Sequence, residues 1–207
     1  MTRNEETAAW MGGAFLVALG VGLLVLFRAG HGARGMVLAT QSVARVAFAF
    51  FWLTYAGGAL PVFFGKEFEG VARRRRAFGL AFATALSVHL TFVAWLFHIL
   101  ILPPVSNAVI FYFGIGAAFA YALALGSVSW VRAVMGEWLW RILSIVGLEY
   151  IALLFFRDFY LLPHYGGRFD TLFYDPFAFL IVIGALLRWG AMLRRRFPGV
   201  PSRSSSG

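Results

Sequence analysis

The chain has 207 residues, of which 61% are hydrophobic and only 13% are charged, with a formal net charge of +9. Soluble domains contain about 25% charged residues, so a soluble fold of this size could not bury the apolar surface. The absence of cysteine excludes disulfides, thiolate metal sites, iron–sulfur ligation and covalent haem attachment. We therefore expect an integral membrane protein, and continuous runs rich in Leu, Ala and Phe favour helices over a β-barrel.

Six apolar stretches are long enough to cross a bilayer, since a membrane helix needs about 20 mostly apolar residues. They are Ala9–Phe27, Val37–Phe64, Phe78–Ile101, Ala108–Trp130, Leu139–Phe156 and Phe173–Leu193. The connections between them are short, which predicts one all-α domain, a polytopic membrane helix bundle over residues 1–196. The remaining residues, 197–207, are rich in Pro, Gly and Ser and predict a disordered tail.

Proline and glycine mark the ends of several spans. Gly57, Gly58 and Pro61 predict a kink or a helix end late in the second stretch. Pro103 with Pro104 is expected to end the third span, because proline disfavours helix in the residue before it. The pair Asp175-Pro176 predicts the start of the sixth span.

Basic residues gather beside the spans, as the positive-inside rule expects for loops that face the cytoplasm. This group comprises Lys66, Arg73–Arg76, Arg132, Arg141, Arg188, Arg194–Arg196 and Arg203. Residues 103–107 carry no charge and residues 157–175 carry balanced charge, so these connections are predicted to face outward, although Arg28 and Arg34 run against the rule. Six spans then place both termini in the cytoplasm, and the net charge indicates topology rather than nucleic-acid binding.

Ionisable groups within the spans are the candidate functional residues, because charge in a bilayer is costly without a partner or a purpose. Counting about 1.5 Å per residue from the predicted cytoplasmic ends places His89 and Glu149 at a similar depth near the midplane. Two interpretations remain open. Either a His89–Glu149 hydrogen bond joins the third and fifth spans, or His89 ligates haem iron while a neighbour orients its ring.

Arg45 and His98 are further cofactor-binding candidates. Arg45 lies at a similar height in the second span, where it could bind a haem propionate or extend toward the outer surface. His98 follows His89 by nine residues, which leaves the two side chains on opposite faces of the helix, so they cannot ligate one haem together. A histidine near the outer boundary also needs no ligand, and both interpretations of His98 stay open.

The segment RRAFGLAFATALSVHL, Arg75–Leu90, resembles the third-span signature of the ferric reductase-like transmembrane domain family, which includes the haem-binding membrane subunit of periplasmic methionine-sulfoxide reductase. In that signature a basic pair precedes Gly-Leu, and a haem-ligating histidine follows ten residues after the glycine, as His89 follows Gly79 here. Trp138-Leu139-Trp140-Arg141 at the start of the fifth span extends the resemblance loosely. It implies a subunit of the bacterial inner (cytoplasmic) membrane with b-type haem on His89.

The fifth span departs from this family, because it contains none of the family's haem-ligating histidines, the first of which would stand near Trp140. A five-coordinate haem, a haem with an unusual second ligand and a haem-free descendant all remain open. The resemblance implies an oxidoreductase component that carries electrons across the bilayer, supplied by a redox partner subunit or a quinol because the chain has no flavin or nicotinamide domain. The alternative is a haem-free structural or interaction subunit of a membrane complex. A transporter has weak support without an inverted repeat.

Overall fold

The computed structural model describes residues 2–100, 106–161 and 171–196, and within these ranges the elements are helical. The elements are α1 (Arg3–Ala29), α2 (Ala33–Ala56), α3 (Leu60–Phe64), η1 (Lys66–Phe68), α4 (Glu69–Arg73), α5 (Arg75–Ile99), α6 (Asn107–Gly126), α7 (Ser129–Met135), α8 (Glu137–Phe156), η2 (Arg157–Leu161) and α10 (Thr171–Arg196). Six described helices are long and apolar enough to cross a membrane: α1, α2, α5, α6, α8 with its η2 extension, and α10. The predicted all-α bundle is confirmed. The proposed tail and the Pro103-Pro104 break lie outside the described residues.

The second predicted span is two helices rather than one. Helix α2 ends at Ala56, and α3 begins at Leu60 with Pro61 in its first turn, a position where a missing N–H costs little. Gly65 then adopts a φ of 95°, which favours glycine, and the chain turns through η1 and α4 into α5. The break that Gly57 and Gly58 predict is confirmed. The second span ends at Ala56, so the predicted stretch to Phe64 was too long.

The sixth span begins earlier than its proline indicates. Helix α10 starts at Thr171, so Pro176 lies inside the helix instead of at its start. The first four N–H groups of a helix have no partner within it, and a proline just beyond them removes a single backbone hydrogen bond. The prediction that Asp175-Pro176 opens this span is therefore wrong by about one turn.

Six serine and threonine hydroxyls within the spans are satisfied by their own helices. Each donates to the backbone carbonyl four residues earlier, at distances from 2.8 to 3.0 Å. These residues are Thr40, Ser42, Thr54, Thr84, Ser87 and Thr91. The hydroxyls therefore add little polarity to the lipid-facing surface, which keeps the spans compatible with a bilayer.

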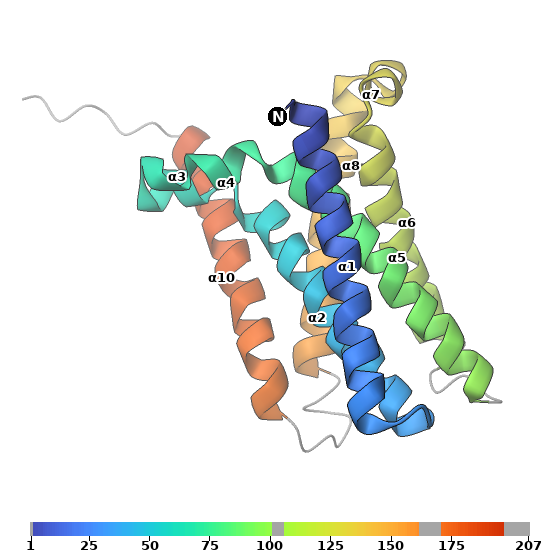
Figure 1. The fold of residues 1–207 in the computed structure, drawn as a ribbon. Coiled ribbons are helices and arrows are strands. Elements are labelled where there is room, and N and C mark those ends of the chain that lie inside the picture. Colours follow the sequence, from blue (N-terminus) through green and yellow to red (C-terminus); the bar gives the residue numbers. More distant parts are fainter. Residues whose placement is uncertain (1, 101–105, 162–170, 197–207) are drawn as a thin grey trace, which may run out of the picture.

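The spans form two packed groups that meet where α5 packs against α6 and where aromatic side chains of α2 and α8 contact each other (Figure 1). Helices α1, α2 and α5 pack closely on one another, and buried alanines such as Ala18, Ala47 and Ala85 let their backbones approach. Helices α6 and α8 form an antiparallel pair joined through α7, while α10 packs against α2 and α8. Between the groups lies an aromatic core in which the rings of Phe48 and Phe155 stand 5.2 Å apart, edge to face.

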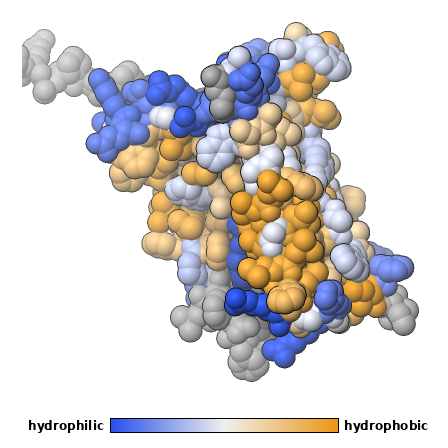
Figure 2. All heavy atoms as spheres, in the orientation of Figure 1, coloured by the Kyte–Doolittle hydropathy of each residue, from blue (hydrophilic) through white to orange (hydrophobic). Residues whose placement is uncertain are grey.

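Polar residues concentrate at the two ends of the bundle. Figure 2 shows hydrophobic atoms over the middle of the visible face and hydrophilic atoms above and below them. We call the end where α1 begins and α10 ends the basic end, and it also carries α3, α4 and α7 (Figure 1). Its cationic residues are Arg3, Lys66, Arg73–Arg76, Arg132, Arg141 and Arg194–Arg196. An ion pair between Arg74 and Glu6 joins the starts of α5 and α1 there.

Candidate functional site

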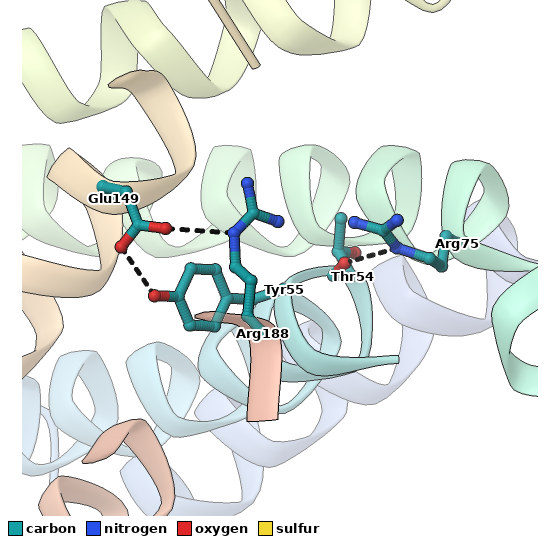
Figure 3. Close-up of polar contacts among 5 residues, drawn as sticks. All are labelled: Thr54, Tyr55, Arg75, Glu149 and Arg188. Atoms are coloured by element: carbon teal, nitrogen blue, oxygen red, sulfur yellow. Dashed lines mark hydrogen bonds and ion pairs between the residues drawn. The ribbon is translucent and has the colours of Figure 1, made fainter. Parts of the chain in front are cut away.

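A charged cluster crosses the interior of the bundle between α2, α8 and α10 (Figure 3). Arg188 donates through Nε to Oε1 of Glu149 at 3.0 Å, and the Tyr55 hydroxyl donates to Oε2 of the same carboxylate at 2.7 Å. The guanidinium carbon of Arg188 also stands 5.0 Å from the centre of the Tyr55 ring. Tyr55 and Arg188 are 2% and 7% exposed. The positive charge of Arg188 is therefore buried, and Glu149 supplies its counter-charge. One carboxylate therefore links three membrane helices.

The predicted hydrogen bond between His89 and Glu149 is not formed. His89 instead lies within 3.1 Å of the Thr40 carbonyl oxygen through its Nδ1 atom. His89 therefore lies at the level of Thr40, and Glu149 lies at the level of Tyr55. These two α2 residues are fifteen residues apart, which is roughly 22 Å of helix, so His89 and Glu149 occupy different depths. The prediction counted residues from the start of each span and assumed that α5 and α8 start at the same depth. In the structure α8 starts farther from the middle of the bundle than α5 does (Figure 1).

His89 has the arrangement of an oriented imidazole. A carbonyl oxygen can only accept, so Nδ1 carries the proton and donates to Thr40, which leaves Nε2 as the ring's acceptor. Metal-ligating histidines commonly have one nitrogen fixed in this way. If haem were bound, His89 would hold its iron through Nε2, while α8 offers no histidine for a second ligand and neither cavity described below includes His89.

The other two predicted cofactor residues lie apart from His89. Arg45 points at α10, with its guanidinium carbon 5.0 Å from the Tyr174 ring centre and 5.7 Å from that of Phe177. Such contacts with aromatic faces stabilise a cation that has left water. His98 is exposed at the end of α5. The structure therefore does not gather Arg45, His89 and His98 into one site, and no group of three or more metal-ligating side chains exists among the described residues.

A small cavity of about 50 Å³ lies beside the charged cluster at the basic end. We call it the arginine cavity, because three of its lining residues are Arg75, Arg188 and Arg195, with Tyr55 and Gly58 beside them. Arg75 donates through Nε to the Thr54 carbonyl at 2.9 Å, and Arg195 donates through Nη2 to the Gly58 carbonyl at 3.3 Å. Backbone carbonyls at the broken end of α2 thus position both guanidinium groups.

A larger hollow of about 390 Å³ lies on the other side of Arg75, between α5, α6 and α8. We call it the basic groove. Its cationic residues stand at the helix ends nearest the basic end: Arg3, Arg75, Arg76 and Arg132. Its apolar residues lie deeper along the same helices: Leu80, Phe82, Ala120, Leu123, Leu148 and Ile151. The volume falls within the range of about 300–1,000 Å³ that is usual for small-molecule sites.

Ser144 on α8 adds a free polar group to the basic groove. Its Oγ atom is buried and has no hydrogen-bond partner among the residues that the structure describes. The hydroxyls of the spans listed above each bond to their own backbone, so the Ser144 side chain behaves differently from them. A buried hydroxyl without a partner costs about 1–3 kcal/mol, which a ligand in the groove would relieve.

Sequence reasoning missed the arginines that build these sites. It assigned Arg188 and Arg75 to the topogenic charge at the cytoplasmic side, although Arg188 stands six residues, or about 9 Å, before Arg194 and therefore lies within the span. That depth was a signal that Arg188 needed a partner, and Glu149 was the acidic residue available within another span. The cavities themselves left no signal in the sequence, because their shape depends on the distances between helices.

Comparison with protein-family models, with curated proteins and with solved structures gave no match to this chain. The resemblance of Arg75–Leu90 to the ferric reductase-like family therefore rests on the residues quoted for it. The structure classifies the chain by its architecture, an integral membrane protein of six spanning helices.

Proposed function

We propose that this protein binds an anionic amphiphile of the membrane in the basic groove, with the basic end in the cytoplasm. The observation that carries the proposal is the order of side chains along the groove. Guanidinium groups stand where a headgroup lies, and alkyl and aromatic side chains follow over roughly 10 Å toward the membrane interior. An anionic head on an apolar chain matches both parts, since arginine favours carboxylate and phosphate oxygens.

The orientation follows from the same charges. Lysine and arginine in short loops remain on the cytoplasmic side during insertion, and they lie at the basic end here. The cytoplasmic leaflet also carries the anionic lipids that a basic surface attracts, at about 1 kcal/mol per basic residue. A bacterial inner membrane, as the sequence resemblance implies, would present such lipids to the groove.

This function requires no haem and agrees with the haem-free alternative, a subunit that acts by binding. His89, the predicted haem ligand, and Glu149, its predicted polar partner, both have structural roles in this proposal. Glu149 joins α8 to α2 and α10, and His89 ties α5 to α2 through Thr40. Whether the subunit works alone or within a complex does not affect the test of the groove.

The test uses two pairs of substitutions: one pair tests the space in the groove, and the other tests its positive charge. Ala124 lines the groove, while the next residue, Leu125, is 62% exposed and does not. Phosphatidylglycerol binding to the protein in maltoside micelles, measured by native mass spectrometry, should fall roughly tenfold in Ala124→Phe and remain unchanged in Leu125→Phe.

The matched pair for charge is Arg76→Gln, which alters the groove, and Arg73→Gln, an exposed arginine outside it. Loss of binding in Arg76→Gln alone supports recognition of the head by the groove. Equal losses in both variants would mean that net charge attracts the lipid without a site. Unchanged phosphatidylglycerol binding in Ala124→Phe would contradict the proposal.

A second candidate function is electron transfer through a b-type haem, fed by a redox partner subunit or a quinol. The fixed Nδ1 of His89 is the observation in its favour, because it leaves Nε2 able to ligate iron. Bound there, haem would supply one-electron transfer. Protein produced with added haem should then show a Soret band that His89→Ala abolishes and His31→Ala, in an exposed loop, keeps. Haem-free protein under these conditions would exclude this function.

A further inference from the structure

The arginine cavity holds more positive charge than its surroundings neutralise. Of its three guanidinium groups, Arg188 has a carboxylate partner in Glu149. Arg75 and Arg195 bond to the carbonyl oxygens of Thr54 and Gly58, which accept a hydrogen bond but carry no net charge. Like charges around one small space repel; water partly screens Arg195, which is exposed, whereas Arg75 is half-buried and is screened less. The described residues therefore leave two cationic charges uncompensated at this point.

The geometry of the two arginines leaves donors free for a ligand. A guanidinium group has five N–H donors, and the structure gives Arg75 a bond through Nε and Arg195 a bond through Nη2. Gly58 makes room for Arg75, since a Cβ atom at that position would stand 2.5 Å from Nη1 of Arg75. Each group is thus held by the backbone at one edge while other N–H groups remain available around the cavity.

The size of the cavity limits what can enter. One water needs about 10–15 Å³ of such space, so about 50 Å³ accommodates a few waters or a single tetrahedral oxyanion. A sterol, a nucleotide or an acyl chain would not fit. Arginine binds phosphate oxygens through paired N–H groups, which gives both charge and geometric match.

We infer that the arginine cavity is a binding site for one phosphate group, taken from inorganic phosphate or from a lipid headgroup. Arg75, Arg188 and Arg195 donate to its oxygens, and Tyr55 with Gly58 forms the wall toward α2. Bound phosphate compensates Arg75 and Arg195 and draws together the ends of α2, α5 and α10. The inference does not rest on the function proposed for the basic groove, which has its own volume and shares only Arg75 with the lining of the arginine cavity.

The experiment uses full-length protein in maltoside micelles and a phosphate-free buffer, because neither component supplies the ligand. The melting temperature is followed by tryptophan fluorescence while inorganic phosphate replaces chloride at constant ionic strength. We expect a saturable rise, since a ligand that binds the folded state alone stabilises it. Phosphatidylglycerol and phosphatidic acid are added in a second series, and a rise with the lipids but not with inorganic phosphate identifies a headgroup as the source.

The matched variants are neighbours on the exposed end of α10. Arg195→Ala removes a cavity donor and should weaken the response roughly tenfold or more, in line with loss of a charged hydrogen bond. Arg194→Ala removes a residue that bonds to the Val62 carbonyl at 3.0 Å outside the cavity, and it should respond as the unmodified protein does.

Two results would overturn the inference: no rise with either form of phosphate, or the same rise in Arg195→Ala as in the unmodified protein. Ala124→Phe separates this site from the basic groove. If the groove does not bind lipid but phosphate still raises the melting temperature in a way that depends on Arg195, the phosphate site is supported independently of the groove. If Ala124→Phe removes the phosphate response, the cavity is not an independent site.

Discussion

Arg188 and Glu149 form an ion pair within the helix bundle, with 3.0 Å between Nε and Oε1, and Tyr55 donates to the second carboxylate oxygen. The two charged residues come from the sixth and fifth spanning helices, which contact each other less than α10 contacts α2 or α8 contacts α6. Apolar packing in lipid gives helices little preference for one partner, because lipid chains are as apolar as leucine. The ion pair therefore contributes specificity at a place where packing alone is weak.

Removing one partner of this pair should destabilise the fold more than removing both. Glu149→Leu leaves the Arg188 guanidinium buried without a counter-charge, and we expect a loss of about 2–3 kcal/mol, reduced by the partial exposure of Glu149. Glu149→Leu combined with Arg188→Leu should recover a large part of that loss, and Glu149→Gln should cost about 1 kcal/mol because it still bonds to Tyr55. Unfolding in mixed micelles measures all three. A double variant as unstable as the sum of the single variants would contradict the coupling.

Two glycines on α1 make a matched pair for close helix packing. A Cβ atom at Gly22 would overlap the ring of Phe92 on α5, which is 3% exposed and cannot move freely. A Cβ atom at Gly20 would meet nothing within 4 Å. We expect Gly22→Ala to lower the free energy of unfolding by about 1–3 kcal/mol, as overpacking does, and Gly20→Ala to leave it unchanged or raise it slightly. Equal effects would show that α1 and α5 do not meet at Gly22.

The contact between α2 and α10 depends on an indole. Trp52 donates through Nε1 to the Leu180 carbonyl at 2.7 Å, and Gly184 on α10 leaves space for the ring. Trp52→Phe keeps the apolar contact but loses the bond, so we expect a destabilisation of about 0.5–1.5 kcal/mol in the same unfolding assay. Trp95→Phe is the control, since Trp95 is 46% exposed, and it should change stability by less than about 0.5 kcal/mol.

The proposed orientation is open to direct measurement. Reporter domains that are active on one side of the membrane, fused within residues 65–76 and within residues 157–173, should report the cytoplasm and the outside respectively, because the first segment is rich in arginine. An odd number of spans separates the two positions. Signals from the same side would therefore contradict the six-span topology, and exchanged signals would reverse the proposed orientation.

The spans were predictable because a run of apolar residues is a local property of the chain. Each predicted stretch overlaps a long helix, from α1 at Arg3–Ala29 to α10 at Thr171–Arg196. The glycine pair after Ala56 also indicated correctly that α2 breaks there. Errors arose at the ends, where Pro176 is accommodated inside α10 and where α3 leaves the span, since capping and loop packing decide those positions.

The partners of the polar residues could not be predicted with the same success. Glu149 was expected opposite His89, yet it bonds to Tyr55 and Arg188. Depth along a helix depends on where that helix starts and how it tilts, and a sequence records neither quantity. Arg75 illustrates the same limit, because four consecutive arginines look alike in sequence and only this one borders both hollows of the basic end.

The way the span hydroxyls bond has a consequence for how the protein is made. Thr40, Thr84 and their equivalents are satisfied within a single helix, so these hydroxyls need no neighbouring helix when their own helix enters the bilayer. Glu149 is different, because its cationic partner, Arg188, is synthesised 39 residues later. Helix α8 therefore enters the membrane before the Arg188 partner of its acid exists, a costly state that ends when α10 arrives. Arrival of α10 thus supplies the counter-charge of Glu149, and a nascent chain interrupted before Arg188 would keep this carboxylate without that partner.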